Sequence, residues 1–425
     1  MSLRRIAALP RPLRFALGLT VGAILYATLQ PADVVERVPP WWCVACGDRG
    51  GADFILNVIL FLPFGCAIGL TGARWRTALW SGLFLSTCIE LTQAFVPGRD
   101  TSLGDVISNS SGAVLGFFVM GVIVAAARRS RPPALPTALS TVLALGLVAL
   151  TGIALSPSYP ASSYFGQWTP DLDGGFEWYR GHVLTASVAG VPLPSRQLDN
   201  QAEVRALLDR GAPIEVMALA GPPPTRLAPL FSIYDDAERE ILLLAPRHSD
   251  LVIRYRTRSL AWGLDRPYLT LRDALAGVRP GDTLHLQLWR EGGGTCLALN
   301  GRRDCPLGFT AGAGWSVLIY PESFHPWLRG FLNAAWLWGI LLPAGYFATS
   351  RSTLVGASLI AALGLLVVPG VVGLQTTPIW EWAGAALGIA TGFWARRALA
   401  RLPLQPERRP QIVFTSSAKQ RSMRS

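Results

Sequence analysis

The segment ELTQAFVPGRDTSLGDVISN, residues 90–109, sets acids, amides and an arginine around one tight turn. The turn itself, Pro97-Gly98-Arg99-Asp100, contains the proline and glycine that reverse a chain, and the flanking sequence is apolar enough to lie in a bilayer. An ionised side chain in hydrocarbon is costly unless it meets a partner or water. We therefore predict that two membrane helices meet at this turn and direct their polar side chains toward each other or toward a wet cavity.

The whole chain has the composition of a polytopic membrane protein. Its 425 residues are 51% hydrophobic and 15% charged, with a mean hydropathy of +0.35, whereas soluble chains carry about 25% charged residues. The net charge of +11 would suit a nucleic-acid partner. However, the basic residues gather at the ends of apolar runs and in the tails, where they orient membrane helices. We predict a membrane protein that does not bind nucleic acid.

About eight apolar runs reach the 17–25 residues, roughly, that cross a bilayer. They lie at 13–30, 53–72, 77–96, 103–127, 135–155, 326–348, 353–374 and 378–398. Arginines flank every second connection, beginning with the N-terminus, so the positive-inside rule places both termini in the cytoplasm and the long polar interval outside. A cleaved signal peptide is the alternative for the first run. We favour an uncleaved anchor because the run is long and no small-x-small site follows it.

These assignments predict five consecutive parts. They are a cytoplasmic tail (1–14), a membrane domain with a fifth span (15–155), an extracytoplasmic β-sandwich (156–325), three further spans (326–400) and a disordered basic cytoplasmic tail (401–425).

The interval 156–325 has the texture of short strands. LVIRYRTR (251–258) and TLHLQLWR (283–290) alternate apolar and polar residues, and TCLALNG ends in an Asn300-Gly301 turn signal. Several such strands, spaced by glycine and proline turns, are typical of a β-sandwich or jelly roll. We therefore expect an all-β insert between the membrane segments.

Four cysteines lie in the segments expected outside the cytoplasm. Cys296 and Cys305 flank the Asn-Gly turn and could pair across two strands in an oxidising compartment. Cys43 and Cys46, in WWCVACGD, could form a second disulfide. A Cys-x-x-Cys pair also fits a redox motif or half of a zinc site, but no second pair and no βαβ context accompany it. The four histidines show no metal-ligand spacing, so we predict no metal and no cofactor.

The stretches PLFSIYDDAEREILLLA, LVIRYRTR and LHLQLWREGGGTCLALNGR make this insert resemble the concanavalin A-like lectin or laminin-G-like jelly roll. The resemblance implies binding of a glycan or a protein, and some relatives are glycanases with two acids on one strand. No Glu-x-Asp-x-x-Glu pattern is present, and Glu238 and Glu240 are expected to be solvated. Binding is therefore favoured over hydrolysis.

Three neighbouring apolar runs each carry an acid and an amide three or four residues apart, and hence on one helix face. The pairs are Asp53 with Asn57, Glu90 with Gln93, and Asp105 with Asn109. All three lie within the turns nearest the same outer surface, where Arg99 could pair with an acid or grip a phosphate or carboxylate. The pattern indicates a polar pocket. The alternative is that the pairs only fasten helices together, at about 1 kcal/mol or less each.

Three ordered motifs resemble the VanZ-like family over residues 15–127. They are D-x-x-x-N-x-x-x-F-x-P-x-G from Asp53, E-x-x-Q from Glu90 and R-D-x-S-x-x-D-x-x-x-N-x-x-G-x-x-x-G from Arg99. The family is named for a protein that raises resistance to the glycopeptide teicoplanin. The resemblance implies a bacterial cell-envelope protein in the cytoplasmic (inner) membrane and a context in glycopeptide resistance, without naming a reaction.

The last three runs resemble runs two to four. FLNAAWLWGILLPAG is similar to FILNVILFLPFG, and PIWEWAGAALGIATGF is similar to DVISNSSGAVLGFF. This alignment matches Gly384, Gly388 and Glu381 with Gly112, Gly116 and Asn109. The E-x-x-Q pair has no counterpart, so we expect a degenerate repeat that kept helix packing and lost most of the polar cluster. The alternative is that glycine-rich membrane helices resemble one another by composition alone.

Two functional hypotheses follow. In the first, the pocket recognises a lipid head group or a lipid-linked cell-wall precursor, while the jelly roll binds a glycan or an envelope protein above it. The acids would bind or activate a polar group, Arg99 would hold an anion, and the amides would orient the ligand. In the second, the protein is an adhesion or assembly scaffold with a structural polar cluster. No nucleophile–base pair is visible, which argues against an enzyme, and the one-sided polar cluster argues against a transporter.

Overall fold

The computed structural model describes residues 10–31, 40–128, 134–172, 175–321 and 324–401. Residues 1–9 of the predicted N-terminal tail and 402–425 of the predicted C-terminal tail lie outside these ranges.

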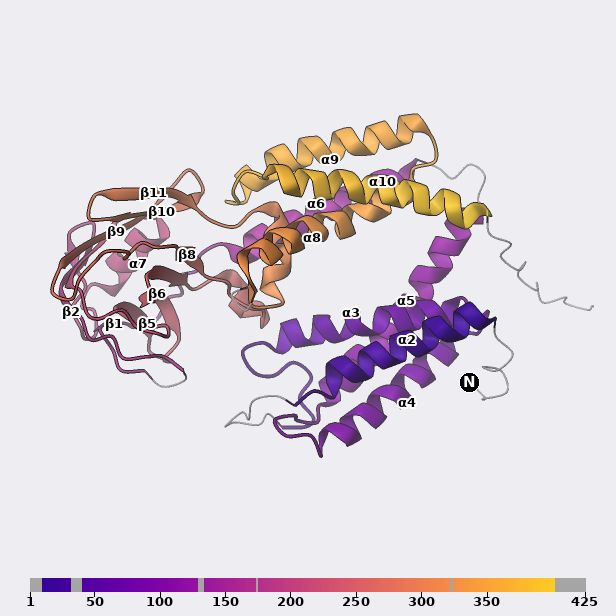
Figure 1. The fold of residues 1–425 in the computed structure, drawn as a ribbon, viewed down its shortest axis with the longest axis horizontal. Coiled ribbons are helices and arrows are strands. Elements are labelled where there is room, and N and C mark those ends of the chain that lie inside the picture. The colour runs from indigo at the N-terminus through magenta and orange to yellow at the C-terminus, as the bar shows by residue number, and fades with distance from the viewer. Residues whose placement is uncertain (1–9, 32–39, 129–133, 173–174, 322–323, 402–425) are drawn as a thin grey trace, which may run out of the picture.

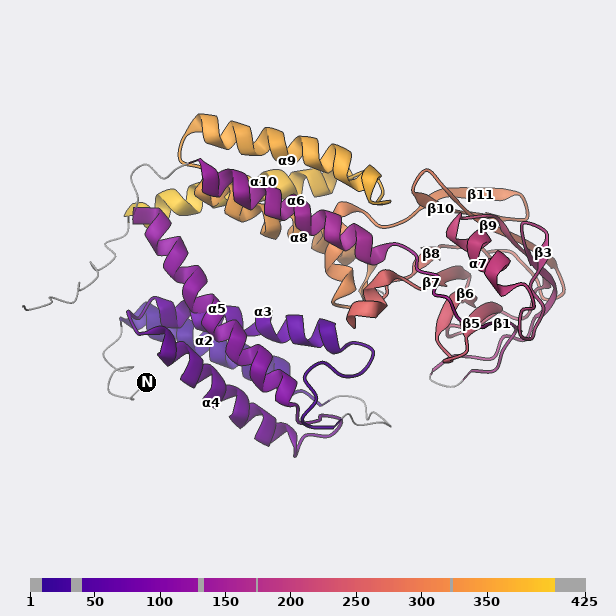
Figure 2. The ribbon, with the colours of Figure 1, turned by 180° about the vertical axis from the view of Figure 1, so that it is seen from behind.

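Within the described ranges, eight long helices follow the predicted apolar runs to within three residues at each end. One bundle contains α2 (Arg11–Thr28), α3 (Gly50–Gly69), α4 (Trp75–Gln93) and α5 (Leu103–Arg128); a second contains α6 (Leu135–Leu155), α8 (Pro326–Phe347), α9 (Arg351–Val371) and α10 (Ile379–Arg401). The helices α3, α5, α6 and α9 are long and apolar enough to cross a membrane. Figures 1 and 2 show the two bundles lying beside each other, with a β-sandwich at one end of the second.

Glycines bring α3 and α5 of the first bundle into backbone contact. A Cβ at Gly116 would overlap the carbonyl oxygen of Leu62, and one at Gly112 would overlap that of Val58. Small residues of this kind let membrane helices approach closely. Close packing matters there, because lipid offers no hydrophobic driving force for helix association. The glycines of the R-D-x-S motif therefore set the distance between the two helices that carry polar pairs.

The second bundle repeats this packing between α8 and α10. A Cβ at Gly392 would overlap the carbonyl oxygen of Leu342, and one at Gly388 would overlap that of Trp338. The contacts keep one register, in which Val58, Leu62 and Gly65 of α3 correspond to Trp338, Leu342 and Gly345 of α8, and Gly112, Ala113 and Gly116 of α5 correspond to Gly388, Ile389 and Gly392 of α10. The prolines inside α3 and α8, Pro63 and Pro343, also correspond.

The expected alignment of the last helix was wrong by one helical turn. Contacts match Gly388 and Gly392, not Gly384 and Gly388, with the two α5 glycines. The sequence allows both registers because α10 has a glycine at every fourth position here, and all three glycines face carbonyl groups of α8. In the observed register Glu381 corresponds to Asp105, and not to Asn109.

The third helices of the two bundles, α4 and α9, have different neighbours. In the first bundle α4 packs along α5, whereas in the second α9 packs mainly against α6, where Gly364 faces Leu145. The face of α10 that corresponds to the α4-covered face of α5 is therefore not closed by α9. The α9 sequence has no counterpart to the E-x-x-Q motif of α4.

The sandwich consists of two antiparallel sheets whose facing side chains form one apolar core. One sheet has the order β1 (Tyr164–Trp168), β5 (Phe231–Asp235), β6 (Glu240–Arg247), β7 (Asp250–Tyr255) and β8 (Leu269–Leu271). The other has the order β11 (Arg302–Leu307), β10 (Gly294–Leu299), β9 (Thr283–Glu291), β4 (Ile214–Leu219), β2 (His182–Val188) and β3 (Val191–Pro192). The alternating stretches predicted as strands form β7, β9 and β10.

The predicted hairpin turn is present between β10 and β11. Asn300 and Gly301 both have positive φ, 49° and 86°, and join strands in which Leu299 pairs with Arg302. A two-residue hairpin loop needs such left-handed residues, which explains the Asn-Gly pair. Cys296 and Cys305 form the predicted disulfide across these strands, with their Cα atoms 4.6 Å apart.

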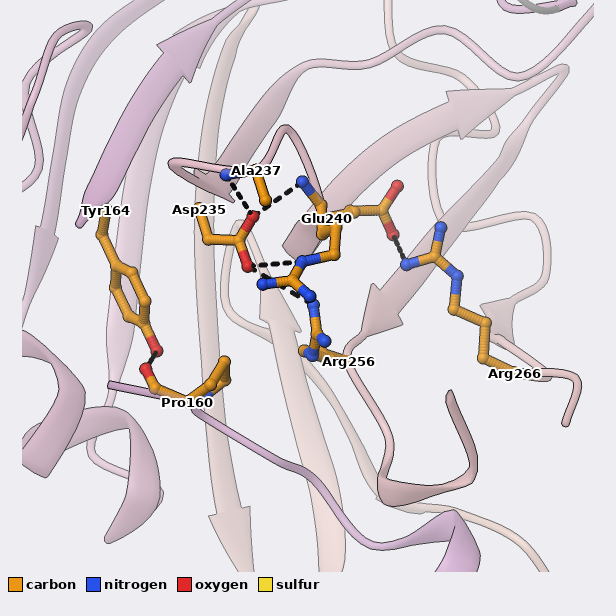
Figure 3. Close-up of polar contacts among 8 residues, drawn as sticks. Pro160, Tyr164, Asp235, Ala237, Glu240, Arg256 and Arg266 are labelled. Carbon is orange, nitrogen blue, oxygen red and sulfur yellow. Dashed lines mark hydrogen bonds and ion pairs between the residues drawn. The ribbon is translucent and has the colours of Figure 1, made fainter. Parts of the chain in front are cut away.

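Two acids of the five-stranded sheet are buried among arginines (Figure 3). Glu240 lies 3.1 Å from Arg266 and 3.2 Å from Arg254, and Asp235 lies 3.0 Å from Arg239. The prediction that Glu240 is solvated was wrong, because it opens the central strand β6, which is covered on both faces. A buried carboxylate requires such partners, so removal of these arginines would leave uncompensated charges in the sheet.

The sandwich also touches the first bundle. Arg49, just before α3, lies 2.8 Å from the buried Asp265, and the Ala52 amide donates to the Gly263 carbonyl at 2.9 Å. The chain enters the sandwich from α6 and leaves it through the short helix η2 (Ala311–Val317) into α8. The same end of both bundles, where α3 and α8 begin, therefore lies next to the sandwich.

Candidate functional site

A cavity of roughly 370 Å³ opens at the end of the first bundle where α3 and α5 begin. Its walls come from the ends of α2 and α4, the starts of α3 and α5, and the loop before α3. All seven predicted site residues line it, namely Asp53, Asn57, Glu90, Gln93, Arg99, Asp105 and Asn109. The residues that their helical spacing placed at a shared depth thus line one cavity.

The α3 and α5 walls meet through an amide–carboxylate bond. Asn57 Nδ2 donates to Asp105 Oδ1 at 2.9 Å. Asp53 lies one turn earlier on α3 and is exposed at the cavity mouth. The backbone contacts of Gly112 and Gly116 hold these helices close enough for this bond.

The α4 wall is held at both of its polar residues. Glu90 is 6% exposed, and its Oε2 accepts the Ser102 backbone N–H at 2.7 Å. Gln93 is 5% exposed, and its Nε2 donates to the Thr28 carbonyl at 2.9 Å. The E-x-x-Q motif therefore ties α4 to the start of α5 and to the end of α2.

Arg99 reaches a backbone carbonyl from the turn between α4 and α5. Its Nε donates to the Gln30 carbonyl at 2.8 Å, and the side chain still lines the cavity. The sequence left open a pairing with an acid or the gripping of an anion. In the observed contact Nε is used by the main chain, and the residue holds the end of α2 at the cavity mouth.

Two buried amide oxygens in the cavity wall have no hydrogen-bond donor within the described part of the chain. They are Gln93 Oε1 and Asn109 Oδ1. Asn109 is 2% exposed and uses its Nδ2 to donate to the Ser86 hydroxyl at 2.9 Å. Buried polar atoms are almost always paired. These two oxygens therefore call for donors supplied by water or by a ligand.

The loop before α3 forms the rim of the cavity. Cys43 and Cys46 form the predicted disulfide there, and both line the cavity. The Leu103 amide donates to the Trp41 carbonyl at 2.8 Å, and a Cβ at Gly104 would overlap the Val44 carbonyl oxygen. The rim thus rests directly on the first turn of α5.

Sequence reasoning missed several residues that shape the cavity. Ser86 precedes Glu90 by four positions and thus shares its helix face, which is a signal that could have identified it. Thr28, Gln30 and Ser102 contribute backbone groups, and side-chain identity carries no signal for such roles.

The second bundle has its own acid–amide pair at the corresponding end. Glu381, in the first turn of α10, is fully buried and accepts Asn333 Nδ2 of α8 at 3.0 Å. Its other contacts come from the segment that enters α8, because the Thr310 hydroxyl and the Gly312 backbone N–H, at 2.9 Å, both donate to it. The expected loss of the polar cluster in this half is therefore incomplete.

One group of three potential metal-ligating side chains with ligand atoms within 4.8 Å of one another occurs in the described ranges. It consists of Glu291, Cys296 and Cys305, and the two cysteines are disulfide-bonded.

The family model described as VanZ/LLP1 matches residues 16–124, which include α3, α4 and most of α5. The match supports the VanZ-like resemblance for the part of the chain that encloses the cavity, and fits a membrane protein of the cell envelope. No curated protein and no solved structure matches the chain. The likeness of the sandwich to concanavalin A-like lectins remains a prediction.

Proposed function

We propose that the first bundle recognises a lipid head group or a lipid-linked cell-wall precursor at the outer face of the bacterial cytoplasmic membrane. One observation carries this proposal: Gln93 and Asn109, whose buried amide oxygens have no donor in the described part of the chain, line a cavity that four carboxyl groups also line, those of Asp53, Glu90, Asp100 and Asp105. A site that only fastened helices together would be expected to satisfy its own buried acceptors. A membrane ligand with hydroxyl or N–H donors would complete the cavity.

The proposed membrane arrangement follows from the arginine pattern. All eight long helices of the described ranges cross the bilayer, both termini are cytoplasmic, and the cavity and the sandwich face outward. The cavity lies at the starts of α3 and α5. A lipid head group of the outer leaflet therefore reaches the cavity without leaving its leaflet.

In this site Asp53, Glu90 and Asp105 accept donors of the ligand, while Gln93 and Asn109 orient it. Arg99, whose guanidinium has further N–H groups beyond the one bonded to Gln30, is available to an anionic part of the ligand. The sandwich above the cavity binds a glycan or an envelope protein. Within the VanZ-like context, the protein acts in the response to glycopeptide antibiotics by binding and not by catalysis.

The second candidate function is a membrane-anchored adhesion or assembly scaffold. It is favoured by the internal bonds that Glu90 makes with Ser102 and Gln93 makes with Thr28, since both fasten helices. In that case the sandwich performs the function, and loss of either bond lowers the abundance of the protein.

Lipid-resolved native mass spectrometry of the full chain separates these functions. Wild type, Arg99→Ala and Glu90→Gln would be purified from bacterial membranes and their bound lipids identified. We expect one lipid or precursor class bound to wild type and depleted in both variants at normal abundance. Arg351→Ala, an exposed arginine at the opposite end of the second bundle, controls for general attraction of anionic lipid and should leave the profile unchanged. Equal profiles in all four proteins would refute the binding proposal and favour the scaffold.

A further inference from the structure

The two bundles share a register, and the second shows its acid with three donors in place. Glu381 and Asp105 hold corresponding positions in the first turns of α10 and α5. Each accepts an asparagine side chain from the neighbouring helix, Asn333 and Asn57 respectively. Asn333 corresponds to Asp53, one turn before Asn57, so the two pairs are similar in kind and displaced by one turn.

The donors at Glu381 belong to a short stretch of main chain. Thr310 supplies a hydroxyl, and Gly312, two residues later, supplies a backbone N–H. A Cβ at Gly312 would lie 2.5 Å from the Glu381 carboxyl carbon, so only glycine brings its N–H this close. The second bundle thus holds a secondary amide and a hydroxyl against its carboxylate.

We propose that this segment is a built-in counterpart of the first bundle's ligand, and that the first cavity takes a group with the same donors, a secondary amide N–H with a neighbouring hydroxyl. This inference rests on the proposed function of the cavity and names the chemical class of its ligand. Such a group occurs in an N-acylated amino sugar and in a hydroxyl-bearing peptide.

The acceptors of the first cavity fit this donor chemistry. Asp105 lines the cavity and accepts from Asn57, and Gln93 and Asn109 line the same cavity with buried amide oxygens that have no donor in the described part of the chain. A phosphodiester would bring only acceptor oxygens to these three positions. An amide N–H and a hydroxyl would instead satisfy atoms that the described part of the protein leaves without donors.

A peptide copied from the second bundle tests the inference. Acetyl-Thr-Ala-Gly-amide repeats residues 310–312, and acetyl-Thr-Ala-sarcosine-amide differs by a methyl group that removes the Gly312-type N–H. Titrations of the full chain in lipid nanodiscs would be followed by saturation-transfer NMR. N-acetylglucosamine and glucose, which has a hydroxyl in place of the acetamido group, form a second pair, and this pair distinguishes a sugar source of the amide from a peptide source. We expect at least one amide-bearing probe to bind roughly tenfold more tightly than its partner that lacks the secondary amide, because hydrogen bonds to charged groups are strong.

Asp105→Asn provides the matched variant. Its side chain would still accept from Asn57 through Oδ1 and would turn its own NH₂ toward the cavity, so a donor replaces an acceptor. We expect loss of probe binding in this variant and unchanged binding in Glu238→Gln, an exposed acid of the sandwich.

Equal binding within both probe pairs, or no binding of any probe, would overturn the amide inference. A lipid class that is lost from Arg99→Ala in native mass spectrometry would, in either case, leave the proposed function intact. Absence of both probe binding and a specific lipid would refute both.

Discussion

The two helical bundles pack α3 against α5 and α8 against α10 in the same way, and they differ at the ends next to the sandwich. In the first, Asp105 borders a cavity with two buried oxygens that have no donor in the described chain; in the second, Glu381 is covered by the main chain that enters α8. The glycine contacts determine how the paired helices pack against each other. The chain segments outside these helices determine whether the acid receives its hydrogen bonds from the protein itself. The same packing therefore lies beside an open cavity in one bundle and beside an internally bonded acid in the other.

The largest expected effect tests the shared frame. Gly116→Ala and Gly392→Ala each place a Cβ on a backbone carbonyl of the facing helix, which cannot move aside as a side chain would. We expect each to lower the free energy of unfolding by about 3 kcal/mol, the upper part of the usual range for overpacking. Reversible unfolding of the full chain in mixed micelles measures this effect.

Two glycines at which an added Cβ would meet nothing within 4 Å, Gly121 on α5 and Gly339 on α8, serve as controls. Their alanine variants should be neutral or slightly stabilising, because alanine favours a helix. A large decrease in the free energy of unfolding for Gly116→Ala, with none for Gly392→Ala, would show that the two bundles do not share this packing.

The next effect tests the difference between the acids. Glu381→Gln replaces one acceptor oxygen with an NH₂ group that faces the donors of Thr310, Gly312 and Asn333. We expect the free energy of unfolding to decrease by about 2 kcal/mol, because buried donors are left without an acceptor. Asp105→Asn keeps its bond to Asn57 and faces a cavity, so its loss should be clearly smaller. The same unfolding assay compares the two variants, and equal losses would show that both acids are structural.

The smallest effect concerns how each bundle is joined to the sandwich. The second bundle is linked through the chain at α6 and η2, whereas the first is held by contacts that include Arg49 and Asp265. Burial raises the pKa of Asp265 from its ordinary value of 3.8 to about 6, with Arg49 opposing and Asp53 adding to the increase. The folded protein therefore binds this proton more tightly than the unfolded chain.

The contribution of Asp265 to stability consequently decreases as the pH rises from about 4 to about 6, the interval between the unfolded and folded pKa values of this residue. Unfolding measured across this interval should show a shallower decrease in Asp265→Asn. An identical pH slope in wild type and variant would contradict this assignment of the proton.

Much of the frame could be predicted because it rests on local signals. Apolar length located the helices, period-two alternation located β7 and β9, and the acid–amide spacing identified residues that share one cavity. The Asn300-Gly301 turn and the flanking cysteines were sufficient to predict a hairpin and its disulfide.

The remaining features depend on contacts between distant segments. The glycine repeat of α10 fits two registers, and only the carbonyls of α8 distinguish them. The burial of Glu240 depends on arginines from β7 and from the segment before β8. Thr310 and Gly312 are ordinary loop residues by sequence, and their role arises because the chain returns from the sandwich directly onto Glu381.

The most direct test of the central claim is a cryo-electron microscopy map of the full chain in nanodiscs prepared from bacterial envelope lipids. We expect non-protein density in the first cavity, in contact with Asp105 and Asn109, and main-chain density of residues 310–312 against Glu381. An empty first cavity, a first cavity filled by the protein's own chain, or non-protein density at Glu381 would contradict it.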